Sequence, residues 1–314
     1  MTAPQTPPLA EVDTAALNGI TALSHLGVIR VQGEDAAAFL QGQLTQDFAL
    51  LGLSEARLAA FCSAKGRMQA SFVGFKRNHQ EICLICPKDV LPATLKRLSM
   101  FVLRAKAKLS DASDTLAVWG LTGKAVPEAL RAGKTWAKVS DGDTDMVRLP
   151  DAMGVLRAYA CGPKEAALEA NLPIALWQWL DVNSGVVLVT APVVDAFVPQ
   201  MLNYESVGGV NFKKGCYPGQ EVVARSQYRG ILKRRAYLTH SEQPLQPGQE
   251  LFHPSDAEQP CGTVVAVAPH PHSGFDALVS VQNSAVDEQP ITVGSSSGSA
   301  LTFKPLPYEL LADI

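Results

Sequence analysis

The most informative stretch of this chain is Phe212-Lys213-Lys214-Gly215-Cys216-Tyr217-Pro218-Gly219-Gln220-Glu221. Residues 217–220 predict a type II turn, because proline suits the second position of that turn and glycine the third. A turn beside two lysines places Cys216 on a polar loop rather than in a core. Cationic neighbours favour the reactive thiolate form of a cysteine. We therefore expect Cys216 to be the reactive or metal-binding cysteine, the alternative being a buried side chain that only packs the loop.

Neither the other five cysteines nor any standard catalytic motif indicates a function for this chain. Six cysteines scattered along 314 residues do not form a disulfide scaffold, which favours a reducing compartment. Cys83 and Cys86 lie three apart on an expected strand, so their side chains point to opposite faces of a sheet. The glycine-rich phosphate and dinucleotide motifs and the paired-histidine zinc motif are absent.

The pattern of residues changes after the cysteine stretch and predicts a small antiparallel barrel. Short alternating runs separated by Pro/Gly turns are expected as strands over 235–239, 250–253, 263–268, 277–282 and 300–303. The preceding part mixes helices with strands. Strands are expected over 26–31, 57–62, 68–76, 81–86 and 102–109, and helices over 34–47 and 87–100. A shorter repeat of this order over 115–171 leads into a helix from Pro173 that ends before Gly185. The fold class is therefore α+β.

The length of 314 residues exceeds the usual size of one domain. We expect an N-terminal tail over 1–19, a first α+β domain over 20–110, a second over 111–228 that ends with the cysteine loop, and a β-barrel over 229–314. No window of about 18–20 residues is apolar enough to cross a bilayer. The N-terminus lacks the basic and apolar regions of a signal peptide. These features predict a cytoplasmic protein without membrane partners.

The charge is unevenly distributed around a net value of −3. Residues 57–108 hold eleven Lys and Arg against Glu81 and Asp89, whereas residues 241–314 hold nine Asp and Glu against Lys304. This asymmetry favours an anionic ligand or partner near the basic segments. A solvated basic face without a partner is the alternative.

Further short motifs occur in order along the chain. They are Phe39-Leu-Gln-Gly-Gln-Leu-Thr45 with Asp47, Ala64-Lys-Gly-Arg-Met68, Phe197-Val-Pro-Gln-Met201, Ala224-Arg225, Arg229-Gly230 and Pro305-Leu-Pro-Tyr308. Together with the cysteine stretch, they resemble the signature of the YgfZ family, the folate-binding relatives of the glycine-cleavage T protein. The resemblance covers nearly the whole chain.

This resemblance implies a T-protein-like ring of three domains around a central channel that holds tetrahydrofolate or a derivative. It implies a role in assembly or repair of iron–sulfur clusters, notably in enzymes that thiolate tRNA. The partners would be reduced folate, iron–sulfur carrier proteins and client iron–sulfur enzymes. Cys216 matches the functional thiol, and it would share a cluster with a partner because one cysteine cannot hold a cluster alone. The matching neighbours are Lys214, Tyr217, Gln220, Glu221 and Arg225.

The resemblance also assigns three folate-binding positions. Trp177 stands where relatives carry a folate-contacting tryptophan, and an indole face suits stacking on a pterin or aminobenzoyl ring. Asn183 stands where relatives usually have a pterin-binding glutamate, and an amide keeps the hydrogen bond but loses the charge. Leu26 replaces an aromatic residue of some members.

Two other function classes remain open. A folate-dependent one-carbon transferase or demethylase needs a carboxylate base in the channel. The aminomethyltransferase relatives carry aspartates where this chain has Ala70-Ser71, which argues against aminomethyl transfer. A direct tRNA-binding module would use the basic stretch over 57–108, although the sequence shows none of the common RNA-binding motifs.

Overall fold

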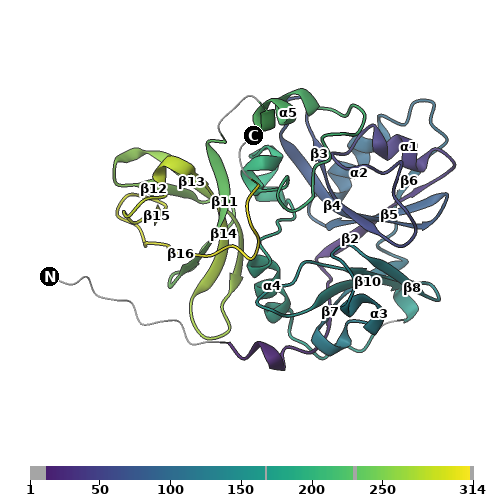
Figure 1. Cartoon of the computed structure of the whole chain (residues 1–314), viewed down its shortest axis with the longest axis horizontal. Coiled ribbons are helices and arrows are strands. Elements are labelled where there is room, and N and C mark those ends of the chain that lie inside the picture. The colour runs from purple at the N-terminus through teal and green to yellow at the C-terminus, as the bar shows by residue number, and fades with distance from the viewer. Residues whose placement is uncertain (1–11, 167, 229–231, 312–314) are drawn as a thin grey trace.

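Three antiparallel sheets surround the centre of the molecule in the computed structural model, which describes residues 12–166, 168–228 and 232–311 (Figure 1). The largest core cluster draws on all three sheets, with Leu58, Tyr159 and Leu278 among its members. The sheets therefore share a central core, in agreement with the ring that the sequence predicts.

The first sheet has the strand order β3-β4-β5-β2-β6. Its strands are β2 (Leu26–Gln32), β3 (Ala56–Cys62), β4 (Met68–Asn78), β5 (Glu81–Pro87) and β6 (Lys108–Asp111), with the helices α1 (Ala36–Gln41) and α2 (Leu91–Ser99). The predictions for β2 to β5 are confirmed to within two residues. The helix expected over 34–47 spans only Ala36–Gln41, and the carbonyls of Gln41 and Leu44 accept hydrogen bonds from Lys214. The strand expected from residue 102 begins only at Lys108.

The second sheet has the order β1-β7-β10-β9-β8. Its strands are β1 (Gly19–Ala22), β7 (Leu116–Thr122), β8 (Lys138–Asp141), β9 (Thr144–Arg148) and β10 (Arg157–Pro163), with the helices α3 (Glu128–Arg131) and α4 (Ile174–Asn183). β1 pairs with β7, from Gly19 opposite Thr122 to Ala22 opposite Trp119. Residues 20–22, expected in the first unit, thus belong to the second sheet.

The third sheet has the order β15-β12-β13-β14-β11-β16 and is curled into a half-barrel (Figure 1). Its strands are β11 (Arg234–Ser241), β12 (Glu250–His253), β13 (Asp256–Pro269), β14 (Phe275–Gln282), β15 (Thr292–Val293) and β16 (Thr302–Lys304). Within residues 232–311 the structure has no α-helix, as the alternating pattern predicts. The expected boundary at residue 229 lies outside the described residues.

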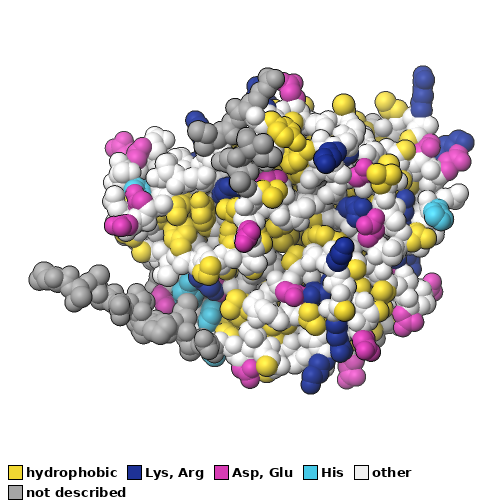
Figure 2. All heavy atoms as spheres, viewed as in Figure 1, with side chains coloured by type: hydrophobic (Ala, Val, Ile, Leu, Met, Phe, Trp, Pro, Cys, Tyr) yellow, Lys and Arg dark blue, Asp and Glu magenta, His cyan; other side chains and the backbone are white. Residues whose placement is uncertain are grey.

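The remaining elements are short and connect the sheets. They are α5 (Gln220–Tyr228) and the 3₁₀ helices η1 (Thr14–Ala16), η2 (Gly123–Ala125), η3 (Lys164–Ala166), η4 (Ala191–Val193), η5 (Pro199–Leu202) and η6 (Asn283–Ala285). In the part of the chain that the structure describes, no helix has the length and apolar character that a bilayer crossing requires. On the face of the molecule that Figure 2 shows, the Lys and Arg side chains lie mainly over the first two sheets.

Candidate functional site

A cavity of about 150 Å³ lies where the three sheets meet. Each sheet contributes to its wall, through Leu26, Leu58, Val73, Tyr159, Val267 and Leu278 among others. The loop that follows α4, residues 184–190, closes one side. Because apolar side chains make up most of this wall, the few polar groups that reach it can orient a ligand.

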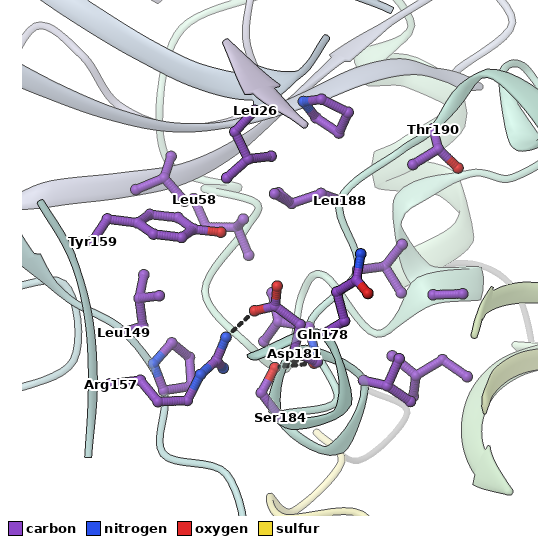
Figure 3. Close-up of a pocket in the computed structure, with 18 of the residues that line it drawn as sticks. Leu26, Leu58, Leu149, Arg157, Tyr159, Gln178, Asp181, Ser184, Leu188 and Thr190 are labelled. Atoms are coloured by element: carbon purple, nitrogen blue, oxygen red, sulfur yellow. Dashed lines mark hydrogen bonds and ion pairs between the residues drawn. The ribbon is translucent and has the colours of Figure 1, made fainter. Parts of the chain in front are cut away.

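Two of those polar groups form an ion pair between β10 and α4. The Arg157 guanidinium donates from Nη2 to the Asp181 carboxylate (Figure 3). Burial lowers the pKa of Arg157 to about 10, so the group remains cationic at neutral pH. The side chain of Asp181 is 32% exposed and lines the cavity.

Tyr159 adds a hydroxyl that points into the cavity (Figure 3). Burial raises the pKa of this phenol to about 12, so it is a neutral hydrogen-bond donor at physiological pH. The cavity can thus accept hydrogen bonds through Asp181 and donate one through Tyr159. A planar heterocycle with N–H groups along one edge and an acceptor elsewhere fits this arrangement, and a reduced pterin is such a ring.

Trp177 does not line the cavity. Its side chain is fully buried, with the Arg157 guanidinium 4.7 Å from the centre of its ring and Gly120 packed against it. The Tyr159 ring lies 5.8 Å away, centre to centre. Trp177 therefore supports two side chains that line the cavity, and direct stacking on a ligand stays a prediction that requires Arg157 to leave the ring.

The other two predicted folate positions differ in their surroundings. Leu26 lines the cavity. Asn183 is buried on α4 and donates to Asp276 at 2.9 Å while accepting from Lys304 at 3.1 Å. Trp179 also donates to Asp276, at 2.8 Å. Asn183 thus binds the third sheet in this structure, and its contact with folate stays a prediction.

Cys216 lies exposed on the loop before α5, whereas Cys62, Cys83, Cys86, Cys161 and Cys261 are buried. The predicted turn is confirmed, since the Gln220 amide donates to the Tyr217 carbonyl at 3.2 Å and Gly219 has a φ of 78°. A Cβ on Gly219 would lie 2.4 Å from the Ser63 carbonyl oxygen. Glycine at this position therefore permits the close approach of the cysteine loop to the β3–β4 hairpin.

Lys214 anchors the cysteine loop to the first sheet. Its buried ammonium donates to the carbonyls of Gln41 and of Leu44, the latter at 2.6 Å, and lies 4.7 Å from the centre of the Tyr217 ring. Burial lowers the pKa of Lys214 to about 8, although Asp47 and Cys216 oppose this shift. The adjacent Lys213 is exposed. One lysine of the pair thus holds the loop while the other faces solvent.

The remaining residues of the cysteine stretch have distinct surroundings. Tyr217 is buried, which raises the pKa of its phenol. Gln220 begins α5, and Arg225 donates to Glu221 at 2.6 Å in an exposed pair. Arg229-Gly230 lies outside the described residues.

The short motifs of the sequence converge on this loop. Gln200 donates to the Val223 carbonyl of α5 at 2.7 Å, and the Met68 amide donates to the Phe197 carbonyl at 2.8 Å. The Tyr308 hydroxyl donates to the Gly185 carbonyl at 2.9 Å, at the end of α4. Residues far apart in the chain thus support the cysteine loop and the helix beside the cavity.

The cysteine loop and the cavity remain separate sites. No residue from 212 to 228 lines the cavity. A polar cleft of about 570 Å³ adjoins the cavity, because Leu58 and Trp136 line both, and Gly208 and Asn211, which precede the cysteine loop, also line it. The cavity and the cleft therefore share part of one wall, and Cys216 lines neither of them.

Sequence reasoning missed Arg157, Tyr159 and Asp181. Asp181 is the one charged residue of α4, which was an available signal for it. Nothing in the local sequence marks Arg157 or Tyr159, because their strand has no polar pattern of its own.

Comparisons with known proteins identify relatives of this chain. No family model matches the chain. It is 30% identical over 305 residues to the tRNA-modifying protein YgfZ of Edwardsiella ictaluri, covering 89% of each chain. It is also 30% identical to the YgfZ protein of Photobacterium profundum, covering 96% of this chain and 95% of that one.

A solved structure shows the same fold. The aminomethyltransferase T of the glycine cleavage system from Bartonella henselae matches with a TM-score of 0.68 at 16% identity, covering 93% of this chain and 86% of that one. At this identity the likeness concerns the fold alone. The sequence identity of 30% to these curated relatives extends over about nine tenths of the chain, so the protein belongs to the YgfZ family.

Proposed function

We propose that this protein binds reduced folate and supports the assembly or repair of iron–sulfur clusters, with Cys216 as the working thiol. The observation that carries the proposal is the isolation of Cys216, which is exposed while the other five cysteines are buried. The relatives are described as tRNA-modifying proteins. Client iron–sulfur enzymes that thiolate tRNA would connect the thiol to that description, in the reducing cytoplasm that six free cysteines favour.

Cys216 would act together with a partner. A thiolate is a good ligand for iron, but a cluster needs several ligands. Among the described residues, no three His, Cys, Asp or Glu side chains lie close enough together to hold a metal ion. An exposed loop thiol leaves room for a carrier or client protein to supply the other ligands.

Reduced folate would place its pterin ring in the central cavity. The Asp181 carboxylate accepts hydrogen bonds and suits the N–H edge of the pterin, a charge-assisted contact. Arg157 orients this carboxylate, and the Tyr159 hydroxyl donates to a ring acceptor. Asp181 would thus supply the carboxylate that the sequence lacks at position 183.

The test compares Cys216→Ser with Cys261→Ser, a matched change at a buried thiol. Both variants are expressed in a bacterium whose own copy of the gene is deleted, and activity of an iron–sulfur tRNA-thiolating enzyme is measured. Cys216→Ser should keep the melting temperature of the wild type and abolish the rescue, because a hydroxyl is a poor cluster ligand. Cys261→Ser should rescue. Full rescue by Cys216→Ser would refute the thiol mechanism.

One observation favours a second candidate, folate-dependent one-carbon transfer. Asp181 places a carboxylate at the cavity, where such an enzyme needs a base. Two contacts argue against this candidate. The Asp181 carboxylate is already paired with Arg157. Ser71, at a position where the aminomethyltransferases carry an aspartate, accepts a hydrogen bond from the Val189 amide at 2.8 Å. Consumption of methylenetetrahydrofolate by the wild type but not by Asp181→Asn would support this candidate.

A further inference from the structure

Trp136 has an unusual backbone conformation. Its φ is 71°, in the left-handed region that bulky residues rarely adopt. Among the described non-glycine residues this conformation is shared by Met153, Asp195 and Asn203. Asparagine and aspartate tolerate it, whereas tryptophan does not. Strained positions of this kind cluster at ligand clamps and switches.

Hydrogen bonds from two sheets hold this conformation. The Trp136 amide donates to the Arg148 carbonyl of β9 at 2.8 Å, and the Ala56 amide of β3 donates to the Trp136 carbonyl at 2.7 Å. Nearby, the Lys138 amide donates to the Ser54 carbonyl at 2.8 Å. Trp136 is thus fixed at the junction of the first and second sheets.

The half-buried Trp136 side chain lines both the central cavity and the polar cleft, as does that of Leu58. These two residues separate an apolar compartment from a polar one. The cleft carries Asp47, Arg57 and Lys134 at its wall, and Arg57 is paired with Glu55.

The sizes of the two compartments decide how a folate can bind. Pockets for small-molecule ligands usually span about 300–1,000 Å³. The cavity of about 150 Å³ has room for a ring system, and the cleft of about 570 Å³ has room for the rest of a longer ligand. Because Leu58 and Trp136 line both compartments, a folate whose pterin lies in the cavity would extend past these two side chains to reach the cleft.

We infer that Trp136 is a specificity-determining residue that stacks on the aminobenzoyl ring of the ligand at this passage. The inference rests on the proposed function. Residues 134–136 and 208–211 would then surround the glutamate tail in the cleft. The site would select pterins conjugated to aminobenzoyl-glutamate over free pterins, because only the conjugate reaches the indole.

The test measures the affinity of the full chain for tetrahydrofolate and for 6-methyltetrahydropterin, which lacks the aminobenzoyl-glutamate part, by anaerobic calorimetry. Trp136→Gly removes the indole and accepts a positive φ. Trp136→Leu removes the ring but keeps apolar bulk, so it decides the matter if the glycine variant does not fold. Trp119→Phe is the matched control, since Trp119 is buried in a separate cluster of the second sheet.

Both Trp136 variants should bind tetrahydrofolate at least tenfold more weakly than the wild type and bind the free pterin within twofold. Trp119→Phe should match the wild type on both ligands. Unchanged affinity for tetrahydrofolate in the Trp136 variants would overturn the inference while leaving the folate proposal intact. Equal losses on both ligands would also overturn it, because Trp136 would then belong to the pterin site. A wild-type protein that binds neither ligand would refute the folate proposal itself, and with it this inference.

Discussion

Replacing Lys214 with methionine should loosen the cysteine loop from the first sheet. The wild-type ammonium donates to two backbone carbonyls, those of Gln41 and Leu44. Methionine keeps the apolar stem of the side chain but donates nothing. Both carbonyls would then lack a partner beneath the loop that carries Cys216.

The expected loss follows from two opposing terms. Leaving a buried carbonyl unpaired costs about 1–3 kcal/mol. Removing a buried charge offsets part of this, because the pKa of Lys214 falls from 10.5 to about 8 and each pKa unit corresponds to about 1.4 kcal/mol. The two carbonyls cost about 4 kcal/mol together and the removed charge offsets at most about 3.5 kcal/mol, so we expect a net destabilisation of about 0.5–1 kcal/mol at pH 7, which lowers the melting temperature by about 1–4 °C.

The effect should grow with pH. Below pH 8 both the folded and the unfolded chain hold the lysine proton, so the wild type bears the full penalty of a buried charge. Between pH 8 and 10.5 the folded chain holds fewer protons than the unfolded chain, and the stability of the wild type rises with pH. The gap between wild type and Lys214→Met should widen by about 1.4 kcal/mol from pH 7 to pH 9.

The assay is thermal unfolding of wild type, Lys214→Met and Lys213→Met at pH 7 and pH 9. The neighbouring Lys213 is exposed, so its replacement is the matched control and should melt within 1–2 °C of the wild type. If Lys214→Met melts like the control at pH 9, where the expected gap is about 2 kcal/mol, the lysine does not anchor the loop. A gap that narrows at pH 9 would contradict the lowered pKa.

Two further predictions concern the turn and the indole behind the cavity. Gly219→Ala should lower the melting temperature more than Gly154→Ala, because both glycines have positive φ but only at Gly219 does a Cβ meet neighbouring atoms within 4 Å; equal shifts would contradict the close packing of the loop on the β3–β4 hairpin. Trp177→Ala should weaken binding of tetrahydrofolate ten- to a hundredfold in a calorimetric titration, about 1–3 kcal/mol, because Arg157 and Tyr159 would lose the ring that they pack against; unchanged affinity would show that Trp177 does not support the site.

Local patterns in the sequence predicted much of the architecture. The alternating runs placed β11 to β14 and β16, and the Pro218-Gly219 pair placed the type II turn. The helix α5 was missed, because Val222 and Val223 are β-branched and follow directly on a turn. Residues 102–109 looked like a strand, yet the strand begins only at Lys108 and Leu103 is 87% exposed. An apolar run predicts burial only where a partner surface covers it.

The site was less predictable than the fold because tertiary packing determines which face of an element meets the cavity. The helix α4 is apolar on nearly every side, so its sequence does not tell which residue faces a ligand. Position 183 points to Asp276 in the third sheet, and Asp181 reaches the cavity. The exposed position of Cys216 was predictable, since the turn and the lysines around it act over a few residues.

The central claim is tested most directly by anaerobic titration of tetrahydrofolate into the wild type, Asp181→Asn and Glu221→Gln. The account predicts one site of micromolar affinity in the wild type and at least tenfold weaker binding by Asp181→Asn, which loses the charge-assisted contact. Glu221→Gln, a change at an exposed carboxylate on α5, should bind like the wild type. Absence of binding by the wild type, or equal binding by Asp181→Asn, would contradict the account.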